Sequence, residues 1–227
     1  MVKYLSSLLF VILMASIGLG RPPTPVRTIE DATSVLTDLG KIPLKGIPPK
    51  LLEDAKAVAI IPGTIKVGFV VGGRMGHGLV LTKNEKGEWS DPTFITLGGA
   101  SVGFQAGVQS TDVVLVFKKR ESLEKVLSGK DKLTLGADAS IAAGPVGREA
   151  GAATDGKLHA EIFSYSRGRG LFAGVSFNGA AIMHDRDNNE MFKADQRAGT
   201  AKAVAKLKAE LMVLGKELPP ATNPRKR

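Results

Sequence analysis

The sequence predicts a single α+β domain, mainly β, in which a curved antiparallel sheet or barrel-like sandwich is flanked by N- and C-terminal helices. Three observations lead to this prediction. A length of 227 residues, 43% of them hydrophobic, suits one domain with a sizeable core. Short apolar or alternating runs follow one another closely from Ala57 to Ile182, separated by turn sequences rich in glycine. This spacing leaves no room for the crossover helices that a parallel sheet needs.

The first twenty residues predict a signal peptide. Lys3 precedes an apolar run of about fifteen residues, which is shorter than the ~20 that span a bilayer as a helix. Gly18 and Gly20 stand before Arg21, where a leader peptidase would cut. An uncleaved N-terminal anchor is the alternative. We therefore expect an exported protein, periplasmic or secreted, that is cleaved near Gly20 and can associate peripherally with a membrane.

The segments before the sheet predict two helices. After a Pro-rich linker at 21–27, Thr28 is expected to cap a helix whose apolar face ends at Gly40. A shorter helix, entered through prolines, is expected within 47–56. The domain is therefore expected to extend over 28–216.

The sheet region predicts strands interrupted by about two helical turns at 120–127. The last helix is expected from Ala194 to Gly215, with an apolar side and interspersed lysines. Such a helix either lies in a membrane interface or packs on its own domain, and the second is the more common arrangement. The tail at 217–227 is too polar and Pro-rich to fold alone.

No motif predicts catalysis, a metal or a cofactor. Ser101 stands in a GASVG sequence that matches a nucleophile elbow by letters, but a strand-like run follows it where that motif needs a helix. The histidines His77, His159 and His184 are too scattered for a zinc site. The run 185–189 begins like a calcium loop but lacks the later glycine and glutamate, so we expect a polar turn.

The charge predicts anionic partners. Without the first twenty residues, 30 basic residues face 22 acidic ones. Nucleic acid is not expected, because export argues against it and aromatic residues for base stacking are few. A basic surface that serves only solubility is the plain alternative.

Five cations stand at or near glycine-rich turns and are the candidate lipid-binding residues: Lys66, Arg74, Arg148, Arg167 and Arg169. Arginine can hold two phosphate oxygens, and neighbouring glycines let an anion approach backbone N–H groups. The stretch FSYSRGRGLFAGVS places two of them in an expected hairpin turn, where they could equally be ordinary exposed turn residues.

Several motifs together resemble the SYLF domain family in order and spacing. The most specific are GFQAGVQSTDVVLVF, AAGPVGR and FSYSRGRGLFAGVS, and the resemblance covers residues 47–192. It implies a non-enzymatic module that binds anionic phospholipids, phosphoinositides among them, and that is linked to actin regulation in eukaryotic members. Because of the leader, we expect actin not to be a partner here. The alternative function is a structural or protein-interaction module of the cell envelope, and a serine hydrolase at Ser101 is a distant third.

Overall fold

The structure is a computed structural model that describes residues 23–41, 46–68, 71–102, 107–145, 160–168, 171–174, 177–195 and 197–216. Its helices are α2 (Pro25–Gly40), α3 (Pro49–Glu53), α4 (Glu121–Leu127), α6 (Arg186–Ala194) and α7 (Ala198–Leu214). Its strands are β1 (Ala57–Gly68), β2 (Val71–Thr82), β3 (Thr93–Val102), β4 (Gly107–Phe117), β5 (Leu133–Thr134), β6 (Ile141–Ala143), β7 (Ile162–Gly168), β8 (Leu171–Gly174) and β9 (Ala181–His184).

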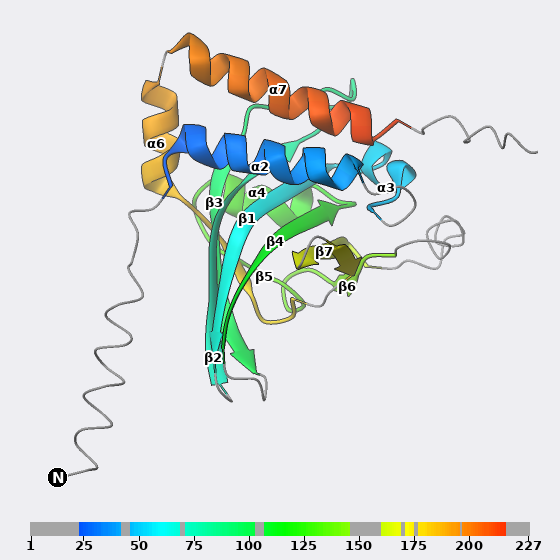
Figure 1. Cartoon of the computed structure of the whole chain (residues 1–227), viewed down its shortest axis with the longest axis vertical. Helices are drawn as coiled ribbons and strands as arrows, with labels where there is room; N and C mark the ends of the chain where they lie inside the picture. The colour runs from blue at the N-terminus through cyan, green and yellow to red at the C-terminus, as the bar shows by residue number, and fades with distance from the viewer. Residues whose placement is uncertain are drawn as a thin grey trace, which may run out of the picture.

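One curved sheet organises these elements (Figure 1). The strand order is β5-β9-β3-β2-β1-β4-β7-β6, and β8 pairs with β7. The pairings are antiparallel, as predicted, except that β6 and β7 are parallel. Helices α2 and α7 lie side by side across one end of the sheet (Figure 1). The predicted class, a mainly β domain with N- and C-terminal helices, is confirmed.

The first helix begins one turn earlier than predicted. Thr24 is its N-cap and accepts a hydrogen bond from the Arg27 N–H, and Pro25 opens the first turn. Thr28, the predicted cap, is buried instead, and its hydroxyl donates to the Thr24 carbonyl at 3.2 Å. The prediction was wrong because the proline at the first helical position marks the start more strongly than the later threonine. The helix ends at Gly40, as predicted.

The predicted polar turn at 185–189 is a helix start, so that prediction was also wrong. Asp185 is the N-cap of α6 and accepts from the Asn188 N–H at 3.1 Å. The predicted C-terminal helix starts four residues later than expected, at Ala198 of α7, because α6 ends at Ala194. Asp195 lies at the break, and its carboxylate accepts from Arg197 and the Thr200 hydroxyl. These hydrogen bonds, those from Arg197 first, hold the pKa of Asp195 far below its usual range.

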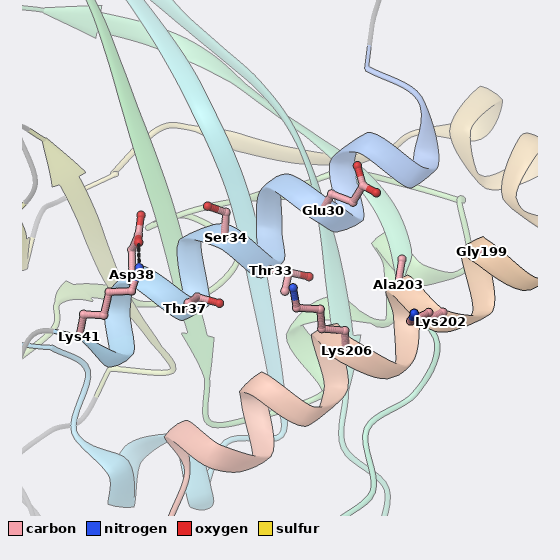
Figure 2. Close-up of a pocket in the computed structure, with 10 residues that line it drawn as sticks. All are labelled: Glu30, Thr33, Ser34, Thr37, Asp38, Lys41, Gly199, Lys202, Ala203 and Lys206. Atoms are coloured by element: carbon pink, nitrogen blue, oxygen red, sulfur yellow. Dashed lines mark hydrogen bonds and ion pairs between the residues drawn. The ribbon is translucent and has the colours of Figure 1, made fainter.

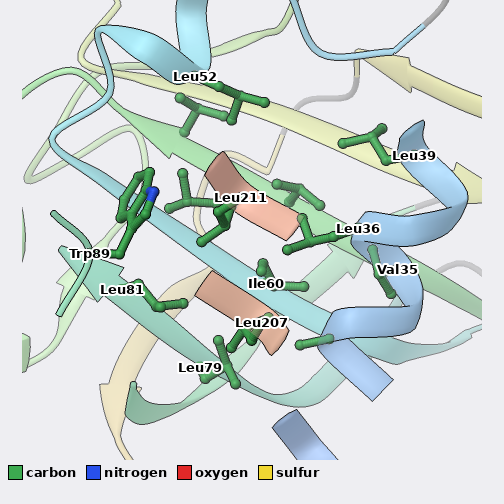
Figure 3. Close-up of a cluster of buried hydrophobic side chains, with 14 of the residues drawn as sticks. Val35, Leu36, Leu39, Leu52, Ile60, Leu79, Leu81, Trp89, Leu207 and Leu211 are labelled. Carbon is green, nitrogen blue, oxygen red and sulfur yellow. The ribbon is translucent and has the colours of Figure 1, made fainter. Parts of the chain in front are cut away.

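Two apolar clusters form the core, one on each face of the sheet. On the face covered by α2 and α7, which we call the helix side, Ile60 and Leu79 pack with Leu36 and Leu207 (Figure 3). On the opposite side, the sheet packs on α4 and the segments around β5 and β9. The C-terminal helix therefore packs its apolar stripe on its own domain, which is the commoner of the two predicted arrangements.

A bulge in β1 separates the covered part of the sheet from the rest. The register with both neighbouring strands shifts by one residue around Pro62 and Gly63, whose φ of 56° suits glycine. Gly78 of β2 packs directly on this region, since a Cβ there would lie 2.4 Å from the Ile60 carbonyl oxygen. Beyond the bulge, β1 to β4 continue away from α2 and α7 (Figure 1). We call this part the distal end; it comprises 65–68, 71–76, 98–102 and 107–110.

Candidate functional site

The distal end brings together two of the predicted cations. Lys66 of β1 and Arg74 of β2 are direct cross-strand partners, so their side chains share the side of the sheet opposite the helices. The Arg74 guanidinium lies over the Phe177 ring, 4.8 Å from its centroid. Its Nε is buried without a hydrogen-bond partner among the described residues, and burial lowers the pKa of Arg74. Because Arg74 remains partly exposed, an anion beside Lys66 could contact the accessible part of its guanidinium.

Arg167 is not a turn residue but belongs to β7, and its charge is used within the molecule. Its guanidinium binds Asp38 of α2, and its Nε donates to Asp112 of β4 at 2.8 Å. Asp112 also accepts the Gly63 N–H at 3.0 Å. Arg167 thus ties α2 to the sheet beside the β1 bulge. The hydrogen bond from Arg167, with a second from Lys41, lowers the pKa of Asp38.

The hairpin that was predicted around Arg167 is present, with Gly168 opposite Leu171 in the β7–β8 pair. Arg148 and Arg169 lie outside the described residues. The structure therefore brings Lys66 and Arg74 together and gives Arg167 two carboxylate partners.

A second group of cations at the other end of β1 was missed by sequence reasoning. A hollow of about 610 Å³ there is lined by Lys56, Lys83, Asn84, Glu85, Lys86, Glu88 and Arg120. Lys83 is held in place, since its Nζ donates to the Leu52 and Glu53 carbonyls at 2.9 and 2.7 Å and lies over the Trp89 ring. These cations come from segments that are distant in the sequence, and no local motif predicts that they lie together. Two glutamates in the lining reduce the net charge of the hollow.

A second hollow, a recess, lies between α2 and α7 (Figure 2). It encloses about 410 Å³ and is lined by Glu30, Thr33, Ser34, Thr37, Asp38, Lys41, Gly199, Lys202, Ala203 and Lys206. Lys202 and Lys206 are exposed on α7, but Glu30 faces the same recess and Asp38 is already bound to Lys41 and Arg167. The recess therefore mixes both signs of charge.

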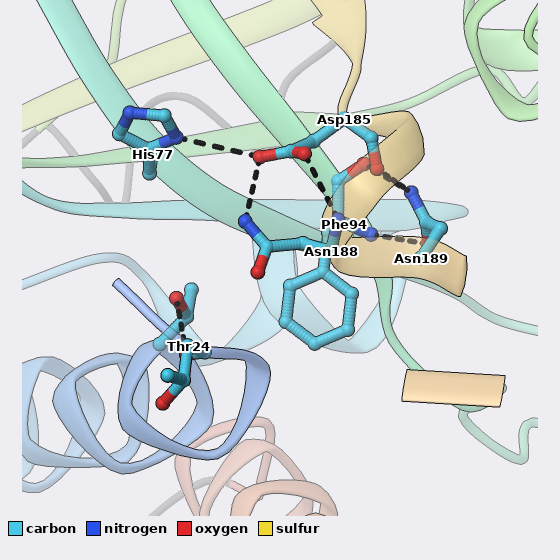
Figure 4. A network of polar contacts seen from close by, with 7 residues as sticks. Thr24, His77, Phe94, Asp185, Asn188 and Asn189 are labelled. Atoms are coloured by element: carbon cyan, nitrogen blue, oxygen red, sulfur yellow. Dashed lines mark hydrogen bonds and ion pairs between the residues drawn. The ribbon is translucent and has the colours of Figure 1, made fainter. Parts of the chain in front are cut away.

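The polar network around Asp185 is structural (Figure 4). His77 Nδ1 lies 3.3 Å from Asp185 Oδ2, and the Asn188 side-chain amide donates to the same oxygen at 2.8 Å. Asn189 bonds both backbone groups of Phe94, with its oxygen 2.9 Å from the Phe94 nitrogen. The network holds α6 against β2 and β3.

No metal cluster is found in the part of the chain that the structure describes. No group of three or more His, Cys, Asp or Glu side chains there could hold a metal ion. Ser101 lies within β3, opposite Gly72, and the next described element is strand β4. Among the described helices, none combines the length and the apolar character that crossing a bilayer requires.

These features describe a single β-rich domain with cations at both ends of its central strands. Residues 98–213, just over half of the chain, match the model of the Ysc84 family, described as "Las17-binding protein actin regulator". The chain belongs to this family, which is the SYLF domain family that the sequence motifs resembled.

Curated relatives are similar to the chain over part of their length. LAS seventeen-binding protein 3 of Saccharomyces cerevisiae is 40% identical over 151 residues, which are 66% of this chain and 32% of the relative. SH3 domain-containing protein PJ696.02 of Schizosaccharomyces pombe is 39% identical over 153 residues, 66% of this chain and 35% of the relative. SH3 domain-containing YSC84-like protein 1 of Homo sapiens is 35% identical over 150 residues, 66% of this chain and 43% of the relative.

The chain thus spans 32–43% of the length of these relatives. Their names describe binding proteins or domain content, and none of them names an enzyme. The family description gives no support to the expectation that actin is not a partner. No solved structure matches the chain.

Proposed function

We propose that this protein is a non-enzymatic module that binds anionic phospholipid headgroups at a membrane surface, with Lys66 and Arg74 as contacts. The observation that carries the proposal is the pairing of these two cations across β1 and β2, where both side chains remain partly exposed. A phosphate oxygen is a strong acceptor for a guanidinium, and lysine adds a second charge beside it.

Lys66 and Arg74 are better candidates for lipid contacts than the described cations whose charges have carboxylates nearby. Arg167 already binds two aspartates, and the hollow near Lys56 includes two glutamates. No ion pair is found for Lys66 or Arg74 in the described part of the chain, so their charge is available to a ligand.

Binding of vesicles tests the proposal. Each basic residue near an anionic surface contributes about 1 kcal/mol at moderate salt, so Lys66→Gln should weaken binding to vesicles of phosphatidylcholine and phosphatidylserine about fivefold. Lys66→Glu should weaken it further, and added salt should reduce the difference. The charge-matched control is Lys202→Gln on α7, which should bind like the parent. Equal affinity of the parent and Lys66→Glu would refute the proposed site.

Arg74 needs a separate control because it packs on Phe177. Arg74→Gln should also weaken vesicle binding, and its urea unfolding curve should be compared with that of the parent. Arg74→Lys keeps the charge but loses the forked guanidinium donors. Its affinity for vesicles should therefore fall between those of the parent and Arg74→Gln.

The place of action that we propose is the outer side of a bacterial-type inner membrane or beyond, after removal of the expected leader at 1–20. That segment lies outside the described residues. N-terminal sequencing of the protein purified from its host tests this proposal, and a mature chain that keeps Met1 would contradict it.

A protein-interaction module is the second candidate function. It is favoured by the names of the family and its relatives, which describe binding to Las17 and actin regulation. Co-sedimentation of the purified full chain with actin filaments tests it directly. Filament binding without any preference for anionic vesicles would support this candidate over lipid binding.

A further inference from the structure

We propose that the distal end of the sheet enters the interfacial layer of an anionic bilayer, with Ile65 and Met75 in contact with lipid. This inference rests on the proposed function, which supplies the charges at this site. It adds an apolar contact on the helix side of the sheet and so identifies the part of the molecule that touches the membrane.

An exposed apolar strip lies on the helix side beyond the reach of α2 and α7. Ile65 and Met75 are cross-strand partners, and they are 43% and 55% exposed. Met183 of β9 is 39% exposed, and its Cε lies 3.4 Å from where a Cβ on Gly98 would be. Since Gly98 pairs with Met75, the three side chains form one strip with a glycine floor.

The alternation of the strands places this strip on the face that is buried elsewhere. Met75 is four residues from Leu79, so both point to the helix side. Leu79 is fully buried under the helices, whereas Met75 has no cover among the described residues. Large side chains left exposed at such a position, with a cation on the adjacent residue of each strand, suit a surface that is apolar inside and anionic outside.

The backbone at this position can enter an apolar layer at low cost. β1 pairs on both sides at Ile65, with Met75 and Ser110 as partners. β2 pairs on both sides at Met75, with Ile65 and Gly98. No strand edge is therefore presented at Ile65 and Met75, and backbone groups there do not have to give up water for lipid.

The neighbouring charges favour a bilayer over a second copy of the chain. Lys66 and Arg74 follow and precede the apolar pair along their strands, on the opposite side of the sheet. The long stem of Lys66 can reach the headgroups while the apolar side chains contact lipid. A stable interface between proteins buries about 800 Å² on each partner, far more than three partly exposed side chains offer.

The absence of cysteine from the chain allows a direct experiment. Met75→Cys, labelled with a polarity-sensitive fluorophore, should shift to shorter emission wavelength with vesicles of phosphatidylcholine and phosphatidylserine. It should also be quenched by lipids that carry a spin label near the headgroup. The matched control is Met212→Cys on α7, because Met212 is also 55% exposed. The label at 212 should remain in water.

Binding of unlabelled variants gives a second measurement. Ile65→Ser with Met75→Ser should reduce the partition coefficient on the same vesicles about tenfold, and this loss should persist at high salt because it removes apolar contacts. The charge variant Lys66→Glu should instead approach the parent as salt is added. Urea unfolding should be nearly unchanged in the double serine variant, since both side chains are exposed.

The outcomes separate this inference from the proposed function. If the protein binds anionic vesicles while the label at 75 stays in water, the inference is overturned and headgroup binding stands. If the parent does not bind anionic vesicles, both fail. A concentration-dependent dimer that the double serine variant abolishes would show that a second copy occupies the strip, and would overturn the inference.

Discussion

The two ends of the sheet are built from the same strands, yet one is buried and the other is exposed. In β2, Leu79 is covered by α2 and α7, while Met75, two positions further along the same face, is 55% exposed. In β1, Ile60 is fully buried and Ile65, beyond the bulge, is 43% exposed. At these compared positions the residues are apolar at both ends.

The difference shows that burial depends on where the helices end. The covered end stabilises the domain through its packing, and its apolar side chains are buried in contacts with one another. The distal end contributes less packing and has both apolar and charged groups available. Stability and surface binding are therefore expected to respond to substitutions at opposite ends of the sheet.

The largest expected effect is on stability at the covered end. Leu36→Ala removes a fully buried side chain of α2 and should reduce the free energy of unfolding by about 2–5 kcal/mol. Met75→Ala at the distal end should change it by about 0.5 kcal/mol or less. Urea denaturation followed by circular dichroism measures both. Similar losses in the two variants would break the contrast between the ends.

A glycine pair in β2 sharpens the comparison at the bulge. Gly78→Ala would place a Cβ 2.4 Å from the Ile60 oxygen and should cost about 1–3 kcal/mol of stability. Gly73→Ala is the control in the same strand, because the nearest atom to its Cβ is 4.0 Å away. Thermal unfolding should show a lower midpoint for Gly78→Ala alone. An unchanged midpoint for Gly78→Ala would mean that β1 does not pack closely against β2 at this glycine.

The stabilisation from the ion pair between Arg167 of β7 and Asp38 of α2 is expected to depend on pH. Arg167 lowers the pKa of Asp38, so the folded state binds its proton less readily than the unfolded chain does. The resulting stabilisation is present above the ordinary carboxyl pKa of about 4 and is lost as the pH falls through the lower folded value. Arg167→Gln should remove this part of the pH dependence.

Unfolding measured between neutral and acid pH checks this expectation. The stabilities of the parent and Arg167→Gln should differ most at neutral pH and converge as the pH falls. Lys41→Gln is a milder comparison, since the hydrogen bond from Lys41 is the second cause of the shift. Parallel pH curves for the parent and Arg167→Gln would contradict the assignment.

The smallest expected effect is on membrane binding at the covered end. Lys56 and Lys66 are ten residues apart along β1, or roughly 30 Å in a strand, which is well beyond a Debye length of about 8–10 Å. Lys56→Gln should therefore change the affinity for anionic vesicles less than Lys66→Gln does. A larger loss with Lys56→Gln would move the site to the hollow beside Lys83.

The motifs of the sequence were sufficient for the family, the fold class and most elements. Alternating runs predicted the strands from Ala57 onward because side-chain alternation is a local property of a strand. The two glycines at 40 and 215 predicted the helix ends, because a helix end is also signalled by local residues. Local signals failed where two of them competed, at Thr24 and Thr28, and where an aspartate in a polar run served as a helix cap.

Only the tertiary structure decided what the cations do. Arg74 and Arg167 look alike in sequence, each beside glycines, yet Arg167 meets Asp38 and Asp112 from two other elements while Arg74 lies over Phe177. The same holds for exposure, because the alternation in β1 marks Ile65 as apolar but does not show that α2 and α7 stop short of it. Pairing and cover depend on residues distant in the chain, and a local pattern carries no record of them.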